Sequence, residues 1–239
     1  MMAIILAGGK GTRLKPYTIT IPKSLLPLGE YPILEIVLRQ LAAAGFTRVI
    51  LSLGHLAHLF TALIGDGKRF GMTVEYIQEE EPLGTAGSLR AVKEVEDHFL
   101  VMNGDLLTTI DFKGLFDQHM KMGAAATIAI HRRQVQVDYG VVEFSPKGLL
   151  LGYREKPIIP YYVSMGVNVL CRQALEMIPP TGKWDMPELM LALKNAGRTV
   201  ACYETNCYWQ DIGRFDDYQQ ASEDFQENPT RFLALEQKA

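Results

Sequence analysis

The sequence has few of the residues that form disulfide frameworks or zinc sites. Its 239 residues include three cysteines and five histidines. Cys171, Cys202 and Cys207 are odd in number and contain no C-x-x-C pair, which is typical of reduced thiols in a cytosolic protein. The histidines form no ligand pattern. A disulfide scaffold and a zinc centre are therefore excluded, and a cytoplasmic location is expected.

The sequence also lacks a long hydrophobic run and a strong excess of charge. No apolar segment approaches the length of a membrane span, and the run that opens the chain is too short for a signal peptide. The net charge of −3 argues against a general nucleic-acid binder. We therefore expect no membrane partner and no nucleic-acid partner. Hydrophobic residues make up 48% of the chain, which is enough for a well-buried core.

Short apolar runs alternate with amphipathic segments in the first half of the chain, which predicts a parallel sheet with helices on both faces. The predicted strands are Ala3–Leu6, Arg48–Ser52, Thr73–Gln78 and Phe99–Met102, and the predicted helices are Ile33–Ala44, His55–Ile64 and Thr85–Val92. The second half predicts four strands with few helices, as antiparallel additions to the same sheet: Ala125–His131, Val141–Phe144, Gly152–Glu155 and Val163–Cys171. Helices Met186–Asn195 and Arg214–Phe225 and strands Thr199–Glu204 and Tyr208–Ile212 follow.

Residues 4–29 (IILAGGKGTRLKPYTITIPKSLLPLG) contain a glycine-rich loop directly after an apolar strand. Glycines at 8, 9 and 11 let backbone N–H groups approach a ligand closely, and Arg13 and Lys23 add positive charge. The spacing matches neither a Walker loop nor the G-x-G-x-x-G dinucleotide pattern. We expect this segment to bind a nucleoside triphosphate.

Asp105 follows a second apolar strand, in the sequence Asn103-Gly104-Asp105. A carboxylate beside a phosphate loop suits Mg²⁺, although an aspartate after glycine is also common in ordinary turns. Ligands of open α/β sheets lie beyond the carboxyl ends of the strands. The glycine loop and Asp105 should therefore meet in one cleft.

The pattern L-A-G-G-x-G-T-R-L over residues 6–14, followed by P-K-x-L-x-P over residues 22–27, resembles the sugar-1-phosphate nucleotidyltransferase (nucleotide-sugar pyrophosphorylase) family. Further motifs extend the resemblance to about residue 218. It implies an α/β fold, a Rossmann-like three-layer sandwich with a mixed, mainly parallel central sheet. We expect one domain over residues 1–226, with a nucleotide-binding half (1–124) and a sugar-phosphate-binding half (125–226). The tail (227–239) is expected to fray, and no C-terminal β-helix or regulatory domain is expected.

The resemblance assigns nucleotide-binding and metal-binding roles to particular residues. The nucleotide-binding set is Leu6, Ala7, Gly8, Gly9, Gly11, Thr12, Arg13, Lys23, Gln78, Gly84, Thr85 and Asp105. Asp211, in Trp209-Gln210-Asp211-Ile212-Gly213, resembles the carboxylate that completes the Mg²⁺ site with Asp105. The neighbouring Asp216 and Asp217 are expected to cap a helix. The three acids at 79–81 are expected to be solvated.

The acceptor side is implied by two later segments, Tyr139-Gly140-Val141 and Glu155-Lys156-Pro157. The implied sugar-phosphate-binding residues are Asn103, Gly140, Glu155, Lys156 and Asn168, and Arg13, Lys23 and Lys156 are the implied catalytic residues. Taken without the resemblance, E-K-P is more simply an exposed charged turn. The chain departs from the family pattern at Ser164, at Asn168 and at Arg214-Phe215, which leaves the sugar open.

The implied reaction joins an NTP and a sugar-1-phosphate to give an NDP-sugar and pyrophosphate, with Mg²⁺ as cofactor. The segment P-L-G-T-A-G at 82–87 favours GTP with a mannose- or heptose-type sugar. A cytidylyl-, uridylyl- or thymidylyltransferase for another sugar phosphate or a non-sugar phosphate is an alternative. A non-catalytic sugar-nucleotide sensor is another, although it would be expected to have lost the charged residues. The sequence leaves the oligomeric state open, including a homo-oligomer.

Overall fold

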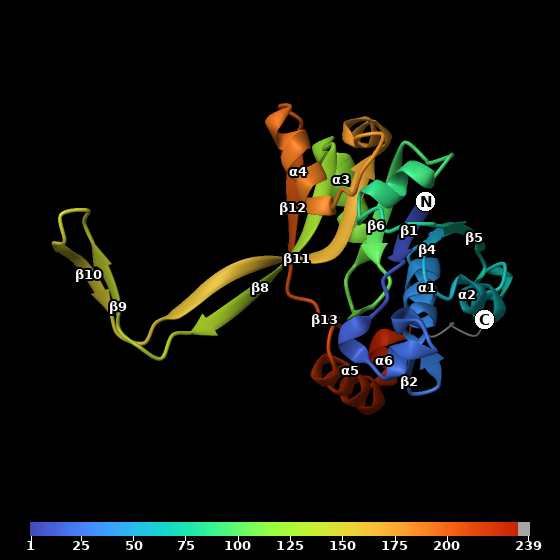
Figure 1. Ribbon diagram of the computed structural model, residues 1–239, viewed down its shortest axis with the longest axis horizontal. Coiled ribbons are helices and arrows are strands. Elements are labelled where there is room, and N and C mark those ends of the chain that lie inside the picture. Colours follow the sequence, from blue (N-terminus) through green and yellow to red (C-terminus); the bar gives the residue numbers. More distant parts are fainter. Residues whose placement is uncertain (234–239) are drawn as a thin grey trace.

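A computed structural model describes residues 1–233, and a seven-stranded sheet forms its centre (Figure 1). The strands are β1 (Met2–Ala7), β4 (Arg48–Leu53), β5 (Thr73–Gln78), β6 (His98–Asn103), β8 (Ala126–Gln136), β11 (Ile158–Cys171) and β12 (Val200–Thr205). Their order is β12-β8-β11-β6-β1-β4-β5. β11 runs antiparallel to both of its neighbours, and the other neighbouring pairs are parallel. The mixed, mainly parallel sheet is confirmed.

Helices cover both faces of this sheet because the strand side chains alternate between the two faces. Ala3 and Ile5 of β1 join the core of α1 (Ile33–Ala43), α2 (Ala57–Ile64) and α3 (Phe112–Met122). Met2 and Ile4 join the core of the opposite face, with α4 (Met186–Asn195). The three layers of the predicted sandwich are these two helical layers and the sheet between them.

A third, smaller core holds the end of the described chain against the first half. It joins the hairpin of β2 (Pro27–Leu28) and β3 (Tyr31–Pro32) to α5 (Phe215–Glu227) and α6 (Pro229–Phe232). The predicted fraying is wrong for residues 229–232, because they form α6 and the side chain of Phe232 is 1% exposed. The rest of the predicted tail, residues 234–239, lies outside the described residues.

Two predictions of local structure in the first half differ from the structure. The predicted helix Thr85–Val92 is only a 3₁₀ segment over Gly87–Ala91. Helix α3 was not predicted, although Asp111 caps it by accepting a hydrogen bond from the Gly114 amide, and Gly123 ends it with φ of 57°. A glycine in the first turn weakens the helical pattern of this segment.

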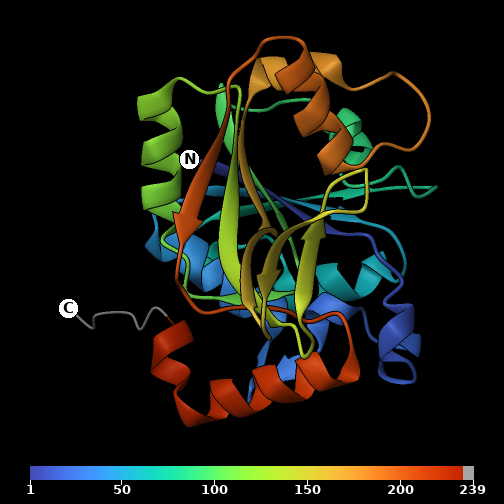
Figure 2. The same ribbon diagram turned by 90° about the vertical axis from the view of Figure 1, so that its left-hand side faces the viewer.

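A long two-stranded arm (residues 131–163) leaves the body of the molecule (Figures 1 and 2). It consists of the outer parts of β8 and β11, which pair from Ile158 with Gln136 inward. At its tip β9 (Val141–Phe144) and β10 (Leu150–Arg154) form a separate two-stranded sheet. The prediction that Val141–Phe144 and Gly152–Glu155 extend the central sheet is therefore wrong, because β8 and β11 carry this hairpin past the edge of the body.

Within residues 1–233 no helix is both long and apolar enough to cross a membrane.

Candidate functional site

The carboxyl ends of β1 and β6 bring the two predicted motifs together. The two strands are parallel neighbours, with Leu6 opposite Asn103. The amide of Gly104 donates to the carbonyl of Leu6 at 2.9 Å, so the chain turns toward the glycine loop directly after β6. Asp105 forms an ion pair with Lys23. The expected single cleft is confirmed.

A cavity of about 230 Å³ lies between the loop and the second motif. It is lined by Leu6, Ala7, Gly9, Gly11, Thr12, Arg13, Lys23, Ser24, Asp105 and Gly213. Two cations and several glycine-flanked backbone amides face one space, which suits a polyphosphate.

The shape of the loop depends on Gly11, whose φ is 58°. Its carbonyl accepts hydrogen bonds from the Thr18 hydroxyl at 2.7 Å and from the Leu14 amide at 2.9 Å. A Cβ at this position would lie 2.9 Å from Cγ2 of Thr18. This closure forms the 3₁₀ turn Thr12–Leu14 and holds Arg13 at the cavity. Gly213 lies against Arg13, with its guanidinium 3.4 Å from where a Cβ would be.

A second small sheet brings Asp211 beside Asp105. β13 (Trp209–Asp211) pairs antiparallel with β7 (Leu106–Thr108), so that Asp211 is opposite Leu106. The Ile212 amide donates to the carbonyl of Asp105 at 3.1 Å. The side chain of Asp211 remains accessible to solvent, but the cleft walls partly dehydrate it. That dehydration, and then the charge of Asp105, raise the pKa of Asp211 against the opposing effects of Lys23 and Arg13.

This pair of carboxylates fits Mg²⁺ better than zinc. Within residues 1–233 no group of three or more histidine, cysteine or acidic side chains is placed to hold a metal. Mg²⁺ commonly takes one or two carboxylates and completes its shell with water and substrate phosphates. The raised pKa of Asp211 shows that the two carboxylates lack sufficient compensating charge, which a divalent cation would supply.

A larger cavity of about 690 Å³ adjoins the phosphate cavity on the side of β4 and β5. Gln78, Gly84 and Thr85 line it, together with the glycine loop. Gly84 has φ of 83°, and a Cβ there would lie 2.3 Å from the carbonyl oxygen of Trp184. The segment is held by Asp185, whose carboxylate accepts from the Thr85 amide at 3.0 Å. This cavity could take a nucleobase.

Glu79 differs from the prediction that all three acids at 79–81 are solvated. Its carboxylate is half-buried and accepts from the hydroxyl of Ser52 at 2.7 Å and from the amide of Leu83 at 3.3 Å. It therefore helps to shape the loop that carries Gly84. Glu80 and Glu81 are exposed, as predicted.

A third cavity, of about 560 Å³, lies across Asn103 and Asp105's neighbour Leu106, on the side of β11. It is lined by apolar side chains with a few polar groups, among them Asn103, Asn168 and Asp211. Gly166, with φ of 71°, leaves room for Asn103, whose Nδ2 is 2.6 Å from where a Cβ would be. No lysine or arginine of residues 1–233 lines this cavity.

Three of the predicted sugar-phosphate residues are not in the cleft. Gly140, Glu155 and Lys156 lie together on the arm, where a Cβ on Gly140 would be 3.1 Å from the Glu155 carboxylate. Glu155 and Lys156 are exposed, and none of the three lines any of the three cavities. Lys156 has φ of 43°, an unusual value for a residue other than glycine.

Several cleft residues were missed by the sequence analysis. Asp185 was missed because D-x-x-E, with Glu188, indicates only the start of a helix, and a capping box does form there. Trp209 lines the third cavity and donates from Nε1 to the carbonyl of Met165 at 3.0 Å. Gly213 sits against Arg13, and its place in the W-x-D-I-G segment was the available signal. Asp217, by contrast, caps α5 as predicted, accepting from the Arg214 amide at 2.8 Å.

Solved structures share this architecture. A Bacillus anthracis protein crystallised in complex with a sucrose has a TM-score of 0.73 at 23% identity, covering 93% of this chain and 94% of its own. HddC from Yersinia pseudotuberculosis has a TM-score of 0.71 at 28% identity, covering 94% of this chain and 99% of its own. The fold is the Rossmann-like sandwich of nucleotide-diphospho-sugar transferases, as predicted.

The sequence profile of the family described as Nucleotidyl transferase matches residues 2–228. The chain belongs to this family. It is 32% identical to a UTP–glucose-1-phosphate uridylyltransferase of Synechocystis, over 92% of this chain and 62% of the relative. It is 34% identical to a mannose-1-phosphate guanylyltransferase of Mycobacterium tuberculosis (93% and 64%) and 33% identical to a glucose-1-phosphate thymidylyltransferase of Streptomyces griseus (91% and 64%). The chain thus spans less than two thirds of the length of these relatives.

Proposed function

We propose that the protein transfers a nucleotidyl group from an NTP to a sugar-1-phosphate, giving an NDP-sugar and pyrophosphate. The observation that carries this proposal is the meeting of Asp105 and Asp211 with Lys23 and Arg13, between a base-sized cavity and an acceptor cavity. The names of the relatives support the same reaction class with three different nucleotides and two sugars.

The proposed mechanism depends on positioning and charge rather than on a covalent enzyme intermediate. The acceptor phosphate is already ionised, so an oxygen of that phosphate attacks the α-phosphorus in line while pyrophosphate leaves. Arg13 is placed to stabilise the leaving pyrophosphate, and Lys23 the triphosphate. Asp105 and Asp211 would hold Mg²⁺, which would neutralise phosphate charge when bound.

For the substrates, we propose GTP with a mannose- or heptose-type sugar-1-phosphate. The P-L-G-T-A-G segment supports this choice, as do the guanylyltransferase names among the relatives and an HddC structure complexed with GMP-PN, which is 25% identical with a TM-score of 0.69. The uridylyl and thymidylyl relatives keep UTP and dTTP as alternatives. Base choice depends on a few hydrogen bonds of about 1–3 kcal/mol each.

We also propose that the two halves divide this work, with residues 1–124 holding the nucleotide and residues 125–226 the acceptor. Most residues of the base and phosphate cavities come from the first half, and Ser164, Asn168 and Trp209 of the acceptor cavity come from the second. A cytoplasmic location is proposed because Cys171, Cys202 and Cys207 are all free thiols.

The test is Mg²⁺-dependent pyrophosphate release across GTP, CTP, UTP, dTTP and ATP. Each is paired with glucose-, mannose-, N-acetylglucosamine- and heptose-1-phosphates. We expect release with the GTP and mannose- or heptose-1-phosphate pairs, abolished in Asp105→Asn and retained in Asp216→Asn, which removes an exposed charge from the first turn of α5. Release with another pair would correct the specificity. Triphosphate binding without release for any pair would indicate a non-sugar acceptor or a sensor.

A further inference from the structure

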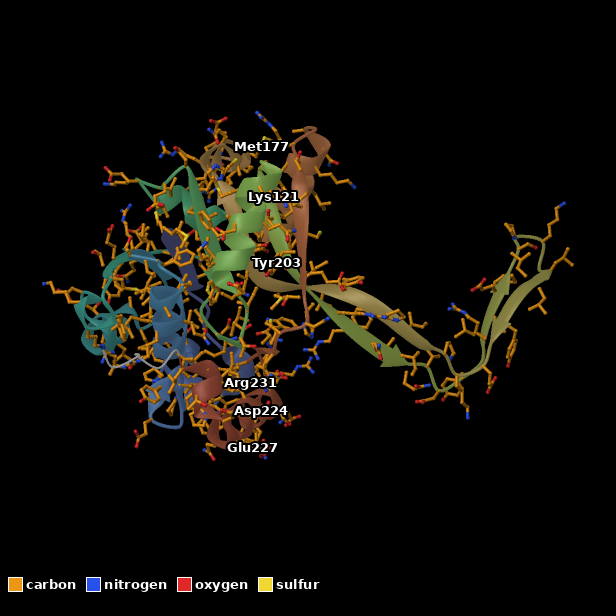
Figure 3. All side chains as sticks on the ribbon, turned by 180° about the vertical axis from the view of Figure 1, so that it is seen from behind. Lys121, Met177, Tyr203, Asp224, Glu227 and Arg231 are labelled. Carbon is orange, nitrogen blue, oxygen red and sulfur yellow. The ribbon has the colours of Figure 1, made fainter. Side chains whose placement is uncertain are left out.

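The arm exposes an apolar surface that the body of its own chain does not cover. More than half of the large hydrophobic side chains that are exposed within residues 1–233 lie on it. Tyr139, Phe144, Leu150 and Tyr153 are 60–80% exposed. Figure 3 shows the arm's side chains standing in open space, whereas Lys121 and Tyr203 lie on the body. An isolated two-stranded hairpin is at best marginally stable in water, so this surface needs a partner.

The acceptor cavity has the complementary deficiency. A sugar phosphate that enters it must approach a triphosphate and two carboxylates, yet no lysine or arginine of residues 1–233 lines it. The arm carries unused cations near its tip, namely Arg154 and Lys156. Lys156 is exposed, and its backbone is fixed by the Gln136 side chain, which donates to the Lys156 carbonyl at 2.9 Å.

The arm cannot deliver these cations to its own cleft without breaking its ladder. β8 and β11 pair continuously from Gln136–Ile158 to Ile130–Ser164, and the register shifts only at the body, between Ser164 and Asn168. Six ladder positions beyond the body correspond to roughly 20 Å at about 3.3 Å per residue. The ladder therefore holds β9 and β10 away from the strand ends that form the cleft (Figure 1).

We propose that a second copy of this chain covers the arm, and that the arm of each chain places Lys156 and Glu155 in the acceptor part of the other chain's cleft. This arrangement rests on the proposed function for the role of Lys156. It would place a cation beside the acceptor phosphate and cover the apolar hairpin in the same step. Exchange of identical elements between two copies is a simple route to a symmetric dimer.

The exposed area is sufficient for such a dimer. Five aromatic side chains on the arm, Tyr139, Phe144, Tyr153, Tyr161 and Tyr162, are 45–80% exposed. At about 150–250 Å² for a whole aromatic side chain, they offer roughly 500 Å² per arm. Two arms then offer about 1,000 Å² before any aliphatic residue is counted, which reaches the size expected of a specific interface.

The test is complementation between two inactive chains. Asp105→Asn and Lys156→Ala chains with different tags are co-expressed, and the heterodimer is purified through both tags in turn. Each variant alone is expected to be at least about 100-fold less active than the wild type. In the heterodimer, the intact cleft of the Lys156→Ala chain receives the intact arm of the Asp105→Asn chain. Pyrophosphate release should therefore return to about half of the wild-type rate per dimer.

The reverse pairing is the matched control. A wild-type chain paired with a chain carrying both substitutions has no cleft with an intact partner arm, so it should be inactive. If each arm served its own chain, this pair would keep about half of the activity and the first pair would be inactive, which would overturn the proposal. Failure to recover any heterodimer would also overturn it.

A second readout does not depend on activity. A Lys183→Arg chain is paired with a Lys156→Arg chain, so an amine cross-link between Lys156 and Lys183 at the cleft can form only between chains. We expect this link, and its absence from the purified heterodimer would contradict the shared cleft. If the wild type releases no pyrophosphate but the link forms, the proposed function fails while the exchange of arms stands.

Discussion

At the scale of single residues, the cleft concentrates charge that the rest of the chain balances only in part. Lys23 pairs with Asp105, while Asp211 has a raised pKa because it is partly dehydrated and lies beside Asp105. Repulsion between two carboxylates costs stability in the free protein, and a bound cation recovers it. Removing one carboxylate should therefore affect metal binding and activity far more than folding.

We expect Asp211→Asn to lower the rate of nucleotidyl transfer by about 10²–10³-fold. Mg²⁺ with a triphosphate should raise the melting temperature of the wild type but not of this variant, which a thermal scan with and without Mg²⁺ measures. The melting temperature without metal should stay the same or rise, because a repelled charge is lost. Asp216→Asn should behave as the wild type, and a variant that kept its Mg²⁺ response would remove Asp211 from the metal site.

Gly84 and Gly182 allow backbone conformation and steric fit to be separated. Both have φ near 80°, but a Cβ on Gly84 would meet the Trp184 carbonyl oxygen at 2.3 Å, whereas one on Gly182 would meet nothing within 4 Å. We expect Gly182→Ala to cost about 1 kcal/mol and Gly84→Ala about 2–4 kcal/mol in the free energy of unfolding. Gly84→Ala should also raise the KM for the triphosphate. Equal losses in guanidinium titrations would show that the loop moves freely.

At the scale of elements, α3 is joined to the sheet by a buried polar chain. His119 is 0% exposed; its two ring nitrogens lie 2.9 Å from His98 Nδ1 and from the Thr127 hydroxyl. Burial, and then the neighbouring His98, lower the pKa of His119 to about 4. The folded protein therefore keeps this ring neutral over a range in which the unfolded chain binds a proton.

Stability should consequently fall as the pH decreases from about 6.5 to about 4. In that interval the unfolded state carries more protons at His119, so protonation favours unfolding. The loss should be on the order of 2–3 kcal/mol, because each pKa unit corresponds to about 1.4 kcal/mol. Guanidinium titrations at pH 7.5, 6, 5 and 4.5 measure it. His119→Gln should flatten the slope, and an unchanged slope in that variant would assign the effect to other groups.

At the scale of the whole molecule, nucleotide binding and acceptor binding are carried by different parts. The base and phosphate cavities belong to the body, while Glu155 and Lys156 lie on the arm. Losing the arm's apolar contacts should therefore separate the two activities.

We expect the triple variant Phe144→Ser, Leu150→Ser, Tyr153→Ser to bind the triphosphate with unchanged Kd but to lose turnover by at least about 100-fold. Light scattering should show the mass of a monomer rather than a dimer. Replacing three exposed body residues, Leu63, Met120 and Met122, by serine is the matched control and should leave mass and turnover unchanged. A monomeric triple variant with full turnover would contradict a role for the dimer.

Much of the fold was predictable because it depends on local patterns. The apolar runs of β1, β4, β5 and β6, with helices between them, required a parallel sheet, and Gly45 follows α1 as a stop. The segment 85–92 was predicted as a full helix because periodicity does not distinguish it from a short 3₁₀ turn. The helix α3 was missed because Gly114 interrupts its pattern.

By itself the sequence determined the phosphate side of this protein. Gly11, Arg13 and Lys23 are close in the chain, and Asp105 ends a strand, so strand ends and short turns were enough to predict their meeting. Only the tertiary structure decided what lies opposite them. Asp185 closes the base cavity from a helix a hundred residues away, and the ladder of β8 and β11 carries Lys156 away from its own cleft. Such long-range placement depends on strand pairing and packing across the sheet, which no local pattern encodes.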